Sequence, residues 1–304
     1  MKFWLPYLKA ILAMLFWSVT FVWIKVALKT YRPYEITFLR LVLAATLLFL
    51  VMWLSKKREK ISTKDYLHLM LVSFCEPFMY FIGEANGMQY VSSTLGSLVI
   101  STIPIFAALG AWIILRERVS LLVLLGLLVS CAGVAVMSLG SGDLSANTKG
   151  IMFLMIAVFA GMFYGITVRN LTHRYSALTI VSWQSLFGML YFLPLFLYYD
   201  GNHFISMKHS TEGLVTIAGM SMFASVGAFM LYTGVIRDLG VIKSNVFTNL
   251  IPVFTVGLAY VFLGDTLSPL AILGLGIALI GLVLSQYKDL LKLNHKKIMS
   301  TFRK

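Results

Sequence analysis

Long apolar blocks repeat along the chain, and short polar stretches separate them. Leu41–Leu54, Leu121–Leu139 and Leu270–Leu284 are three such blocks. A helix needs about 20 apolar residues to cross roughly 30 Å of hydrocarbon. In lipid, the backbone N–H and C=O groups must be paired within their own segment, which favours helices. The pattern therefore predicts an all-α integral membrane protein.

Ten segments fit this description, at residues 7–28, 36–55, 67–90, 95–115, 120–139, 150–169, 179–199, 213–236, 244–263 and 268–287. The connections are short, so we expect no inserted soluble domain. The first segment begins like a signal peptide but has no small-residue cleavage site, and we expect it to remain as a span. Composition agrees, since only 12% of the residues are charged, against about a quarter in soluble domains.

The net charge of +13 does not point to nucleic acid, because the cations follow the predicted topology. With a cytoplasmic N-terminus, 19 of the 25 Lys and Arg residues lie on the cytoplasmic side. Four lie on the other side: Lys29, Arg32, Lys149 and Lys208. This bias is the positive-inside rule, and it predicts that both termini are cytoplasmic. We expect membrane lipid, with anionic headgroups, as a partner of the basic surface and no nucleic acid.

A repeat with an offset of 148 residues joins the two halves of the chain. Over residues 103–133, ten positions are identical to their counterparts, including Pro104 with Pro252, Ser120 with Ser268, Gly126 with Gly274 and Gly133 with Gly281. The offset covers five spans, an odd number, so the two copies must have opposite orientations. Inverted repeats are typical of secondary transporters, with the substrate site near the bilayer midplane. We expect five-helix repeats at residues 1–148 and 149–287, followed by a basic cytoplasmic tail at 288–304.

The motif around the first proline resembles a known family. GMQYVSSTLGSLVISTIPIFAALGAWIILRERVS, followed by LLGLLVSCAGVAVM, is similar to the signature of EamA-type permeases of the drug/metabolite transporter superfamily. The second copy, Gly234–Leu284, fits the same pattern, with Asp265 as its acidic residue. The resemblance implies ten helices in two inverted five-helix repeats. It also implies efflux or exchange of small metabolites, such as amino acids, amines or related amphipathic solutes, across the prokaryotic inner membrane.

Two glutamates inside the third span are the first candidates for the site, since ionisable residues in a membrane are costly and suggest function. Glu76, Tyr80 and Glu84 are spaced at i, i+4 and i+8 and share one helix face. Pro77 removes a donor and predicts a bend beside the first glutamate. One glutamate binds a cationic group of the substrate or carries a coupling proton; alternatively, it is a structural partner of a nearby cation.

That cation is Arg40 or Lys25. Arg40 is surrounded by apolar residues in FLRLVLAA. Its planar guanidinium suits a substrate carboxylate, but it could equally be the fixed counter-ion of a glutamate in the third span. Lys25 lies close enough to the end of the first span to extend toward the interface.

Aromatic and small polar residues complete the candidate set. Trp17 and Trp183 lie inside their spans beside polar neighbours, where they either form a pocket wall or pack in the core. Asn245 and Asn249 are one turn apart, and the repeat pairs them with two serines. The candidate binding or coupling residues are Trp17, Ser18, Arg40, Glu76, Tyr80, Glu84, Ser101, Tyr164, Trp183, Gln184, Tyr232, Asn245 and Asn249, with Pro77, Pro104 and Pro252 as hinges.

An enzyme is the alternative that we weighed, in the form of an intramembrane aspartyl protease with Asp200 and Asp265. Both aspartates fall at predicted span ends, the five histidines are scattered over span ends and loops, and the two cysteines make no zinc site. No Walker lysine motif occurs, which excludes ATP drive. We expect a non-enzymatic transporter without cofactor or metal, with a small-molecule substrate, protons as the candidate coupling ion, and a monomeric or weakly dimeric state.

Overall fold

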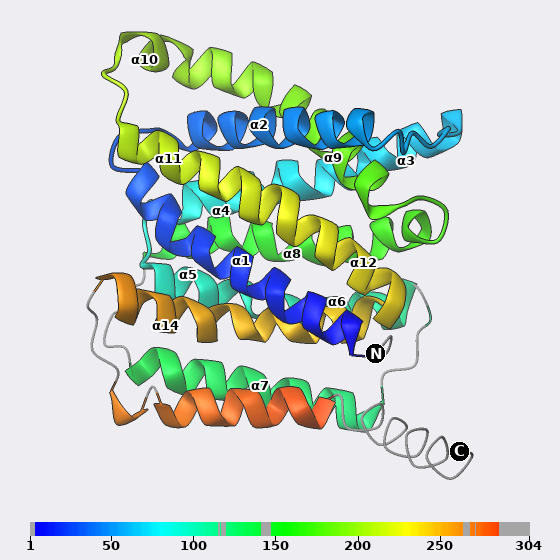
Figure 1. Cartoon of the computed structure of the whole chain (residues 1–304). Coiled ribbons are helices and arrows are strands. Elements are labelled where there is room, and N and C mark those ends of the chain that lie inside the picture. Colours follow the sequence, from blue (N-terminus) through cyan, green and yellow to red (C-terminus); the bar gives the residue numbers. More distant parts are fainter. Residues whose placement is uncertain are drawn as a thin grey trace.

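The computed structural model describes residues 4–114, 116, 120–140, 147–263, 268–270 and 272–285, and all regular structure in these ranges is helical. The helices lie side by side as a bundle (Figure 1). In chain order they are α1 (Leu5–Ala27), α2 (Pro33–Leu54), α3 (Thr63–Ser73), η1 (Phe74–Met79), α4 (Tyr80–Gly87), α5 (Ser93–Ile100), α6 (Ile103–Ile114), α7 (Leu121–Gly140), α8 (Thr148–Thr172), α9 (Ala177–Leu195), η2 (Phe196–Asp200), α10 (Gly201–Ser206), α11 (Thr211–Gly219), η3 (Met220–Ala228), α12 (Phe229–Leu239), α13 (Val241–Val246), η4 (Phe247–Asn249) and α14 (Leu250–Leu263).

Within the described ranges, eight helical segments are long and apolar enough to cross a membrane, which makes this a multi-pass membrane protein. They correspond to eight of the ten predicted spans. The predicted spans 120–139 and 268–287 fall on shorter apolar helices, Leu121–Gly133 and Ile272–Ser285. The predicted basic tail, at residues 288–304, and Asp265 lie outside the described residues.

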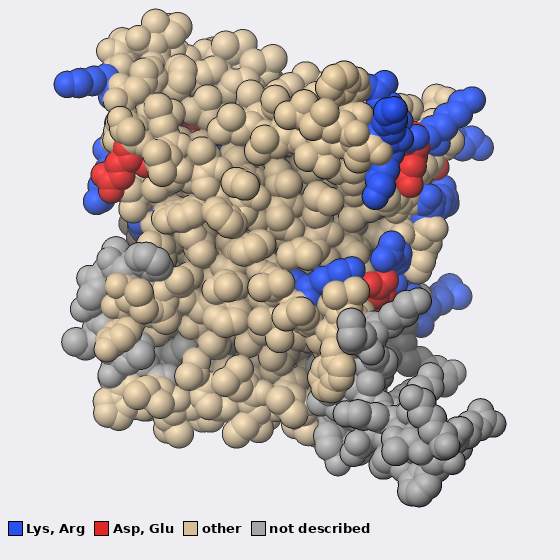
Figure 2. Space-filling model, in the orientation of Figure 1, with Lys and Arg blue, Asp and Glu red and all other residues tan. Residues whose placement is uncertain are grey.

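The bundle has an apolar middle and charged ends (Figure 2). We call the end where α1 begins the basic end; the turn at residues 173–176 lies there too. The other end, which carries the turn at residues 28–32, is the opposite end. Large apolar side chains face outward, among them Trp53 and Leu54, as expected of a surface in contact with lipid. The interior holds buried charged groups, which the site must account for.

Two of the spans are interrupted midway by wider helical turns. In the span Thr63–Gly87, Glu76 has non-helical torsion angles (φ −146°, ψ 120°), and Pro77 follows it within η1. In the span Thr211–Leu239, η3 occupies the middle. Such wide turns recur at functional sites, and the bend predicted at Pro77 is confirmed as an interruption of the helix.

Two other spans break just ahead of the proline residues that we predict to be hinges. α5 ends at Ile100 and α6 begins at Ile103, so Pro104 lies in the first turn of α6. Pro252 lies in the first turn of α14, directly after η4. Proline fits a first helical turn because its missing N–H is unpaired there anyway. Motion at these positions remains a prediction.

α7 and the helix Ile272–Ser285 pack against each other through glycines at the edge of the bundle (Figure 1). Gly126 lies against Gly281, and Gly133 lies against Gly274 and Ala278. Between them the hydroxyl of Ser130 donates a hydrogen bond to the carbonyl of Ala278 at 3.1 Å. Small residues let the two backbones approach closely, which is how helices associate in lipid.

Replacing Gly133 with alanine is expected to destabilise the protein by about 1–3 kcal/mol, the usual cost of overpacking. The added Cβ would lie 2.8 Å from the carbonyl oxygen of Gly274 and would force the helices apart. The midpoint of thermal unfolding in detergent measures the effect. Gly257→Ala is the matched control, since nothing lies within 4 Å of its added Cβ. Equal midpoints for both variants would contradict the close packing.

Candidate functional site

A small cavity in the middle of the bundle collects most of the predicted site residues. Of the thirteen predicted binding or coupling residues, eight line it: Trp17, Arg40, Glu76, Tyr80, Glu84, Tyr164, Tyr232 and Asn245. Phe21, Phe81, Thr248 and three isoleucines, which the sequence did not single out, line it as well. The cavity measures about 40 Å³, enough for a few water molecules at about 10–15 Å³ each. A solute of amino-acid size therefore needs the helices to move apart.

Arg40 is held in place by fixed partners. Its Nε donates to the hydroxyl of Ser225 at 2.6 Å, and its Nη1 lies 3.6 Å from Oε2 of Glu84. The guanidinium carbon stacks 4.2 Å from the ring centre of Phe81. Arg40 is 2% exposed and Glu84 is 4% exposed. This geometry favours the counter-ion alternative for Arg40 over a free site for a substrate carboxylate.

Glu76 differs from Glu84 in its surroundings. It is 7% exposed and lines the cavity, but among the described residues it has no hydrogen-bond or ion-pair partner. The interruption of the helix at Glu76 turns this residue out of the regular ladder. A buried carboxylate without a partner is costly, so its presence requires a ligand or a proton.

Aromatic rings form the wall of the cavity around this carboxylate. The ring of Trp17 lies 4.9 Å from that of Tyr232 and 5.3 Å from that of Phe229, both edge-on. The ring of Tyr164 meets Phe229 on its other side, at 6.0 Å. An aromatic wall around one carboxylate suits an organic cation, since ring faces attract positive charge.

Five predicted residues lie outside the cavity lining. Trp183 packs against Phe49 and Tyr66, with ring centres 5.6 and 4.9 Å away. This supports core packing rather than a pocket wall as its role. Gln184 reaches the cavity only through the hydroxyl of Tyr164, at 3.5 Å. Ser18, Ser101 and Asn249 complete the five; the two serines bond to carbonyls of their own helices, and the Nδ2 of Asn249 contacts a thiol. Helix rotation, which the sequence alone does not reveal, explains these differences.

A cluster of polar contacts lies at the basic end. Oδ1 of Asp65 accepts a hydrogen bond from Arg174 at 2.6 Å, and its Oδ2 accepts from Tyr175 at 2.7 Å and Ser62 at 2.8 Å. Beside it, Glu59 accepts from the backbone N–H of Ser176 at 2.9 Å. We call these residues the basic-end latch. It joins the start of α3 to the turn between α8 and α9.

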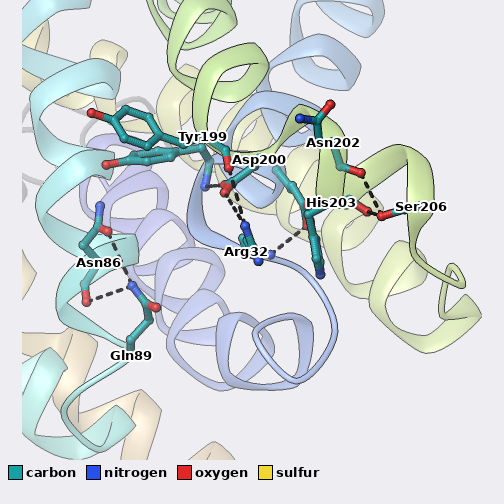
Figure 3. Close-up of polar contacts among 10 residues, drawn as sticks. Arg32, Asn86, Gln89, Tyr199, Asp200, Asn202, His203 and Ser206 are labelled. Atoms are coloured by element: carbon teal, nitrogen blue, oxygen red, sulfur yellow. Dashed lines mark hydrogen bonds and ion pairs between the residues drawn. The ribbon is translucent and has the colours of Figure 1, made fainter.

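A second cluster of polar contacts lies at the opposite end (Figure 3). The carboxylate of Asp200 lies 3.7 Å from Nη1 of Arg32 and accepts from the backbone N–H of Tyr34 at 3.2 Å. Glu35 is fully buried and lies 2.6 Å from Nδ1 of His203. His203, one of the five histidines at span ends and loops, therefore has a buried carboxylate partner. These four side chains, Arg32, Glu35, Asp200 and His203, form the opposite-end latch.

The protease alternative finds no support in these contacts. Asp200 is engaged in the opposite-end latch, far along the bundle from the cavity lining. Asp265, its proposed partner, is outside the described ranges. In the part of the chain that the structure describes, no three His, Cys, Asp or Glu residues gather as metal ligands, and Cys75 and Cys131 are free thiols.

The basic-end latch predicts a pH dependence. Burial by itself raises the pKa of Glu59, but hydrogen bonds from Thr179 and Ser176 outweigh it and hold the pKa below its ordinary value of 4.5. A carboxylate with a lowered pKa stabilises the folded protein above its unfolded pKa and loses this contribution as the pH falls through the folded value. Glu59→Gln should therefore lower the thermal midpoint at pH 7, and the difference from the original chain should shrink below about pH 4.5. A difference that stays constant down to pH 3 would contradict this.

Comparison with known proteins gives one family and distant relatives. The model of the EamA-like transporter family matches residues 4–139 and, separately, 148–287. An "Uncharacterized transporter YetK" from Bacillus subtilis is 27% identical over 252 residues, covering 82% of this chain and 76% of that protein. A "Probable terminal-alkyne amino-acid exporter" from Streptantibioticus cattleyicolor is 26% identical and covers 67% of each chain. A solved crystal structure that covers 93% of this chain superimposes with a TM-score of 0.76 at 14% identity, which supports the fold alone.

Proposed function

Because this chain belongs to the EamA-like transporter family, we propose that it is a secondary transporter that exports or exchanges small amine-bearing solutes. Candidate solutes are amines, amino acids and related amphipathic metabolites. The observation that carries this proposal is Glu76, a buried carboxylate that lines an aromatic cavity and has no hydrogen-bond or ion-pair partner among the described residues. A protonated amine supplies the missing positive charge, and the rings of Trp17 and Tyr232 enclose its apolar part. The exporter from Streptantibioticus cattleyicolor is, by its name, an amino-acid exporter, which agrees with this substrate class.

We propose that the two family matches are inverted repeats of five helices each, at residues 1–148 and 149–287. The packing supports this arrangement. α8, the first helix of the second repeat, packs against α4 and α6 of the first repeat. α1, the first helix of the first repeat, packs in the same way against α12 and α14 of the second. The contact between α7 and Ile272–Ser285 is self-symmetric as well. The 148-residue offset maps Gly126 onto Gly274, Ser130 onto Ala278 and Gly133 onto Gly281.

Alternating access follows from the two latches. Each latch joins a side chain of segment 4–139 to one of segment 148–287, as Asp65 with Arg174 and Glu35 with His203 do. With both latches formed, the cavity is too small for the solute. Opening one latch at a time, with bending at the helix breaks near Pro104 and Pro252, exposes Glu76 to each side in turn.

The surroundings of the transporter follow from charge. By the positive-inside rule, the basic end faces the cytoplasm of a prokaryotic inner membrane, and anionic lipid surrounds it. We propose that Glu76 carries a proton when no amine is bound, so that protons are the coupling ion. We propose that the protein works as a monomer or a weak dimer.

Counterflow in proteoliposomes tests the proposal. Vesicles preloaded with an unlabelled amine or amino acid are mixed with trace labelled solute, and accumulation is compared with that in empty vesicles. We expect saturable accumulation of at least one amine-bearing solute and none of matched solutes that lack the amine. Accumulation of only amine-free acids or sugars would overturn the amine assignment.

Variants of two tryptophans distinguish a ring that lines the cavity from a ring that packs outside it. Trp17→Ala should raise the KM for the amine by about ten-fold, since a cation–ring contact contributes about 0.5–2 kcal/mol. Trp183→Ala serves as the matched control. It should leave KM unchanged and lower the thermal midpoint, because Trp183 packs against Phe49 and Tyr66. An unchanged KM for Trp17→Ala would remove that ring from the site.

A further inference from the structure

A second cavity lies at the opposite end of the bundle, away from Glu76 and the aromatic wall. It measures about 440 Å³, and four basic side chains line it: Lys25, Lys29, Arg32 and His203. Gln89 and Tyr31 add polar groups, and none of the described lining residues is acidic. We call this cavity the basic pocket. It takes no part in the amine site described above.

The carboxylates next to the basic pocket are already engaged. Glu35 is fully buried, accepts from the backbone N–H of Arg32 at 2.8 Å and contacts His203. Asp200 is 5% exposed and holds Arg32 and the N–H of Tyr34. These two carboxylates therefore pair with Arg32 and His203, and among the described residues no carboxylate pairs with Lys29, so the pocket keeps the positive charge of Lys29.

The donors of the pocket come from three parts of the chain. Lys25 and Lys29 lie on and just after the end of α1, Gln89 lies just after the end of α4, and His203 lies on α10. Lys25 donates to the carbonyl of Met88 at 2.5 Å, which fixes its stem near Gln89. Figure 3 shows Arg32 close to His203, and Gln89 further away beside Asn86. All three residues line the basic pocket.

Topology does not explain this cluster. The positive-inside rule accounts for cations at the basic end and predicts few at the opposite end. Two of the four cations assigned to that side, Lys29 and Arg32, nevertheless line one pocket, together with Lys25 from the end of α1. Convergent ammonium and guanidinium groups form charge-assisted hydrogen bonds with carboxylate and phosphate oxygens.

We propose that the basic pocket binds one oxyanion, a carboxylate or phosphate group, at the opposite end of the protein. The oxyanion belongs either to a free solute or to the headgroup of an anionic lipid. Binding neutralises Lys29 and the neighbouring cations and strengthens the fold around the turn at residues 28–32.

Thermal unfolding of the purified full chain in detergent tests this. The probes are sodium phosphate and sodium acetate, each compared with sodium chloride at the same ionic strength. Bound anion raises the midpoint in a concentration-dependent manner. In Lys29→Gln, the phosphate concentration that gives half of the shift should rise by about ten-fold. Lys208→Gln is the matched control, since Lys208 is exposed at the same end and is not among the lining residues.

A charge-preserving variant and a lipid arm complete the test. Lys29→Arg should restore the response to phosphate. In nanodiscs, phosphatidylglycerol identifies a lipid headgroup as the ligand if it stabilises the original chain more than Lys29→Gln and if phosphate displaces it. A thermal shift with phosphate or acetate but not with phosphatidylglycerol identifies a free solute as the ligand. No anion-specific shift in the original chain, or equal shifts in all variants, would overturn the proposal. Because transport is not measured, this outcome is independent of the amine proposal.

Discussion

Replacing Glu76 with glutamine is expected to lower the counterflow of the amine substrate at least about thirty-fold. Removing one partner of a buried charge pair costs about 2–5 kcal/mol, and each 1.4 kcal/mol is a factor of ten in affinity. Among the described residues Glu76 lines the cavity without a hydrogen-bond or ion-pair partner, so in the proposed transporter the substrate amine is the charge that pairs with it. Glutamine keeps the shape and removes the charge.

Glu212→Gln is the matched control for this prediction, because Glu212 is an exposed glutamate in the first turn of α11. It should transport at the original rate. Repeating the assay with an imposed pH gradient shows whether Glu76 also carries a proton: the gradient should drive flux in the original chain and not in Glu76→Gln. Normal flux in Glu76→Gln at every pH would place recognition elsewhere on the wall, with Asn245 as the next candidate.

Replacing Arg40 with methionine is expected to destabilise the protein by about 3–5 kcal/mol, the usual cost of leaving one charge of a buried pair alone. Glu84 would lose its cation and Ser225 would lose the donor at 2.6 Å. The midpoint of thermal unfolding in detergent, together with the yield of folded protein, measures this loss. The effect is on the fold, because Arg40 holds two helices together.

The double variant Arg40→Met with Glu84→Gln should recover most of the lost stability, since no unpaired charge then remains in the interior. Arg237→Met is a control for loss of an arginine in a pair, because Arg237 and Asp238 form an exposed pair at 3.0 Å, worth about 0–1 kcal/mol. An Arg40→Met protein as stable as the original would contradict the counter-ion role, and the substrate-carboxylate alternative would then be preferred.

The polar residues of the third span show how far sequence reasoning reaches. The spacing of Glu76, Tyr80 and Glu84 placed them on one face, and all three line the same cavity. The sequence could not predict which of the two glutamates pairs with a cation, because that cation, Arg40, lies on another helix. Ser225 was missed for the same reason, although the 148-residue offset pairs it with Pro77 and marks it as an interior position.

The latches at both ends were missed altogether. Glu35 and His203 are 168 residues apart in the chain, and Asp65 and Arg174 are 109 apart. Each residue by itself has the appearance of an ordinary charged group at the end of a span. Their pairing is visible only once the turns and helix ends are placed beside one another.

The sequence by itself determined eight of the ten predicted spans, the interruption of the third span at Pro77 and the family, since apolar length, a missing N–H group and the repeated motif are local properties of the chain. Only the tertiary structure decided which polar side chains meet. It showed that Glu84 pairs with Arg40 whereas Glu76 does not, among the described residues. It also showed that Trp183 packs outside the cavity lining and that Lys29 and His203 line the same pocket. The physical reason is that helix rotation and contacts between distant segments depend on packing, and the apolar pattern that specifies a membrane helix leaves both undetermined.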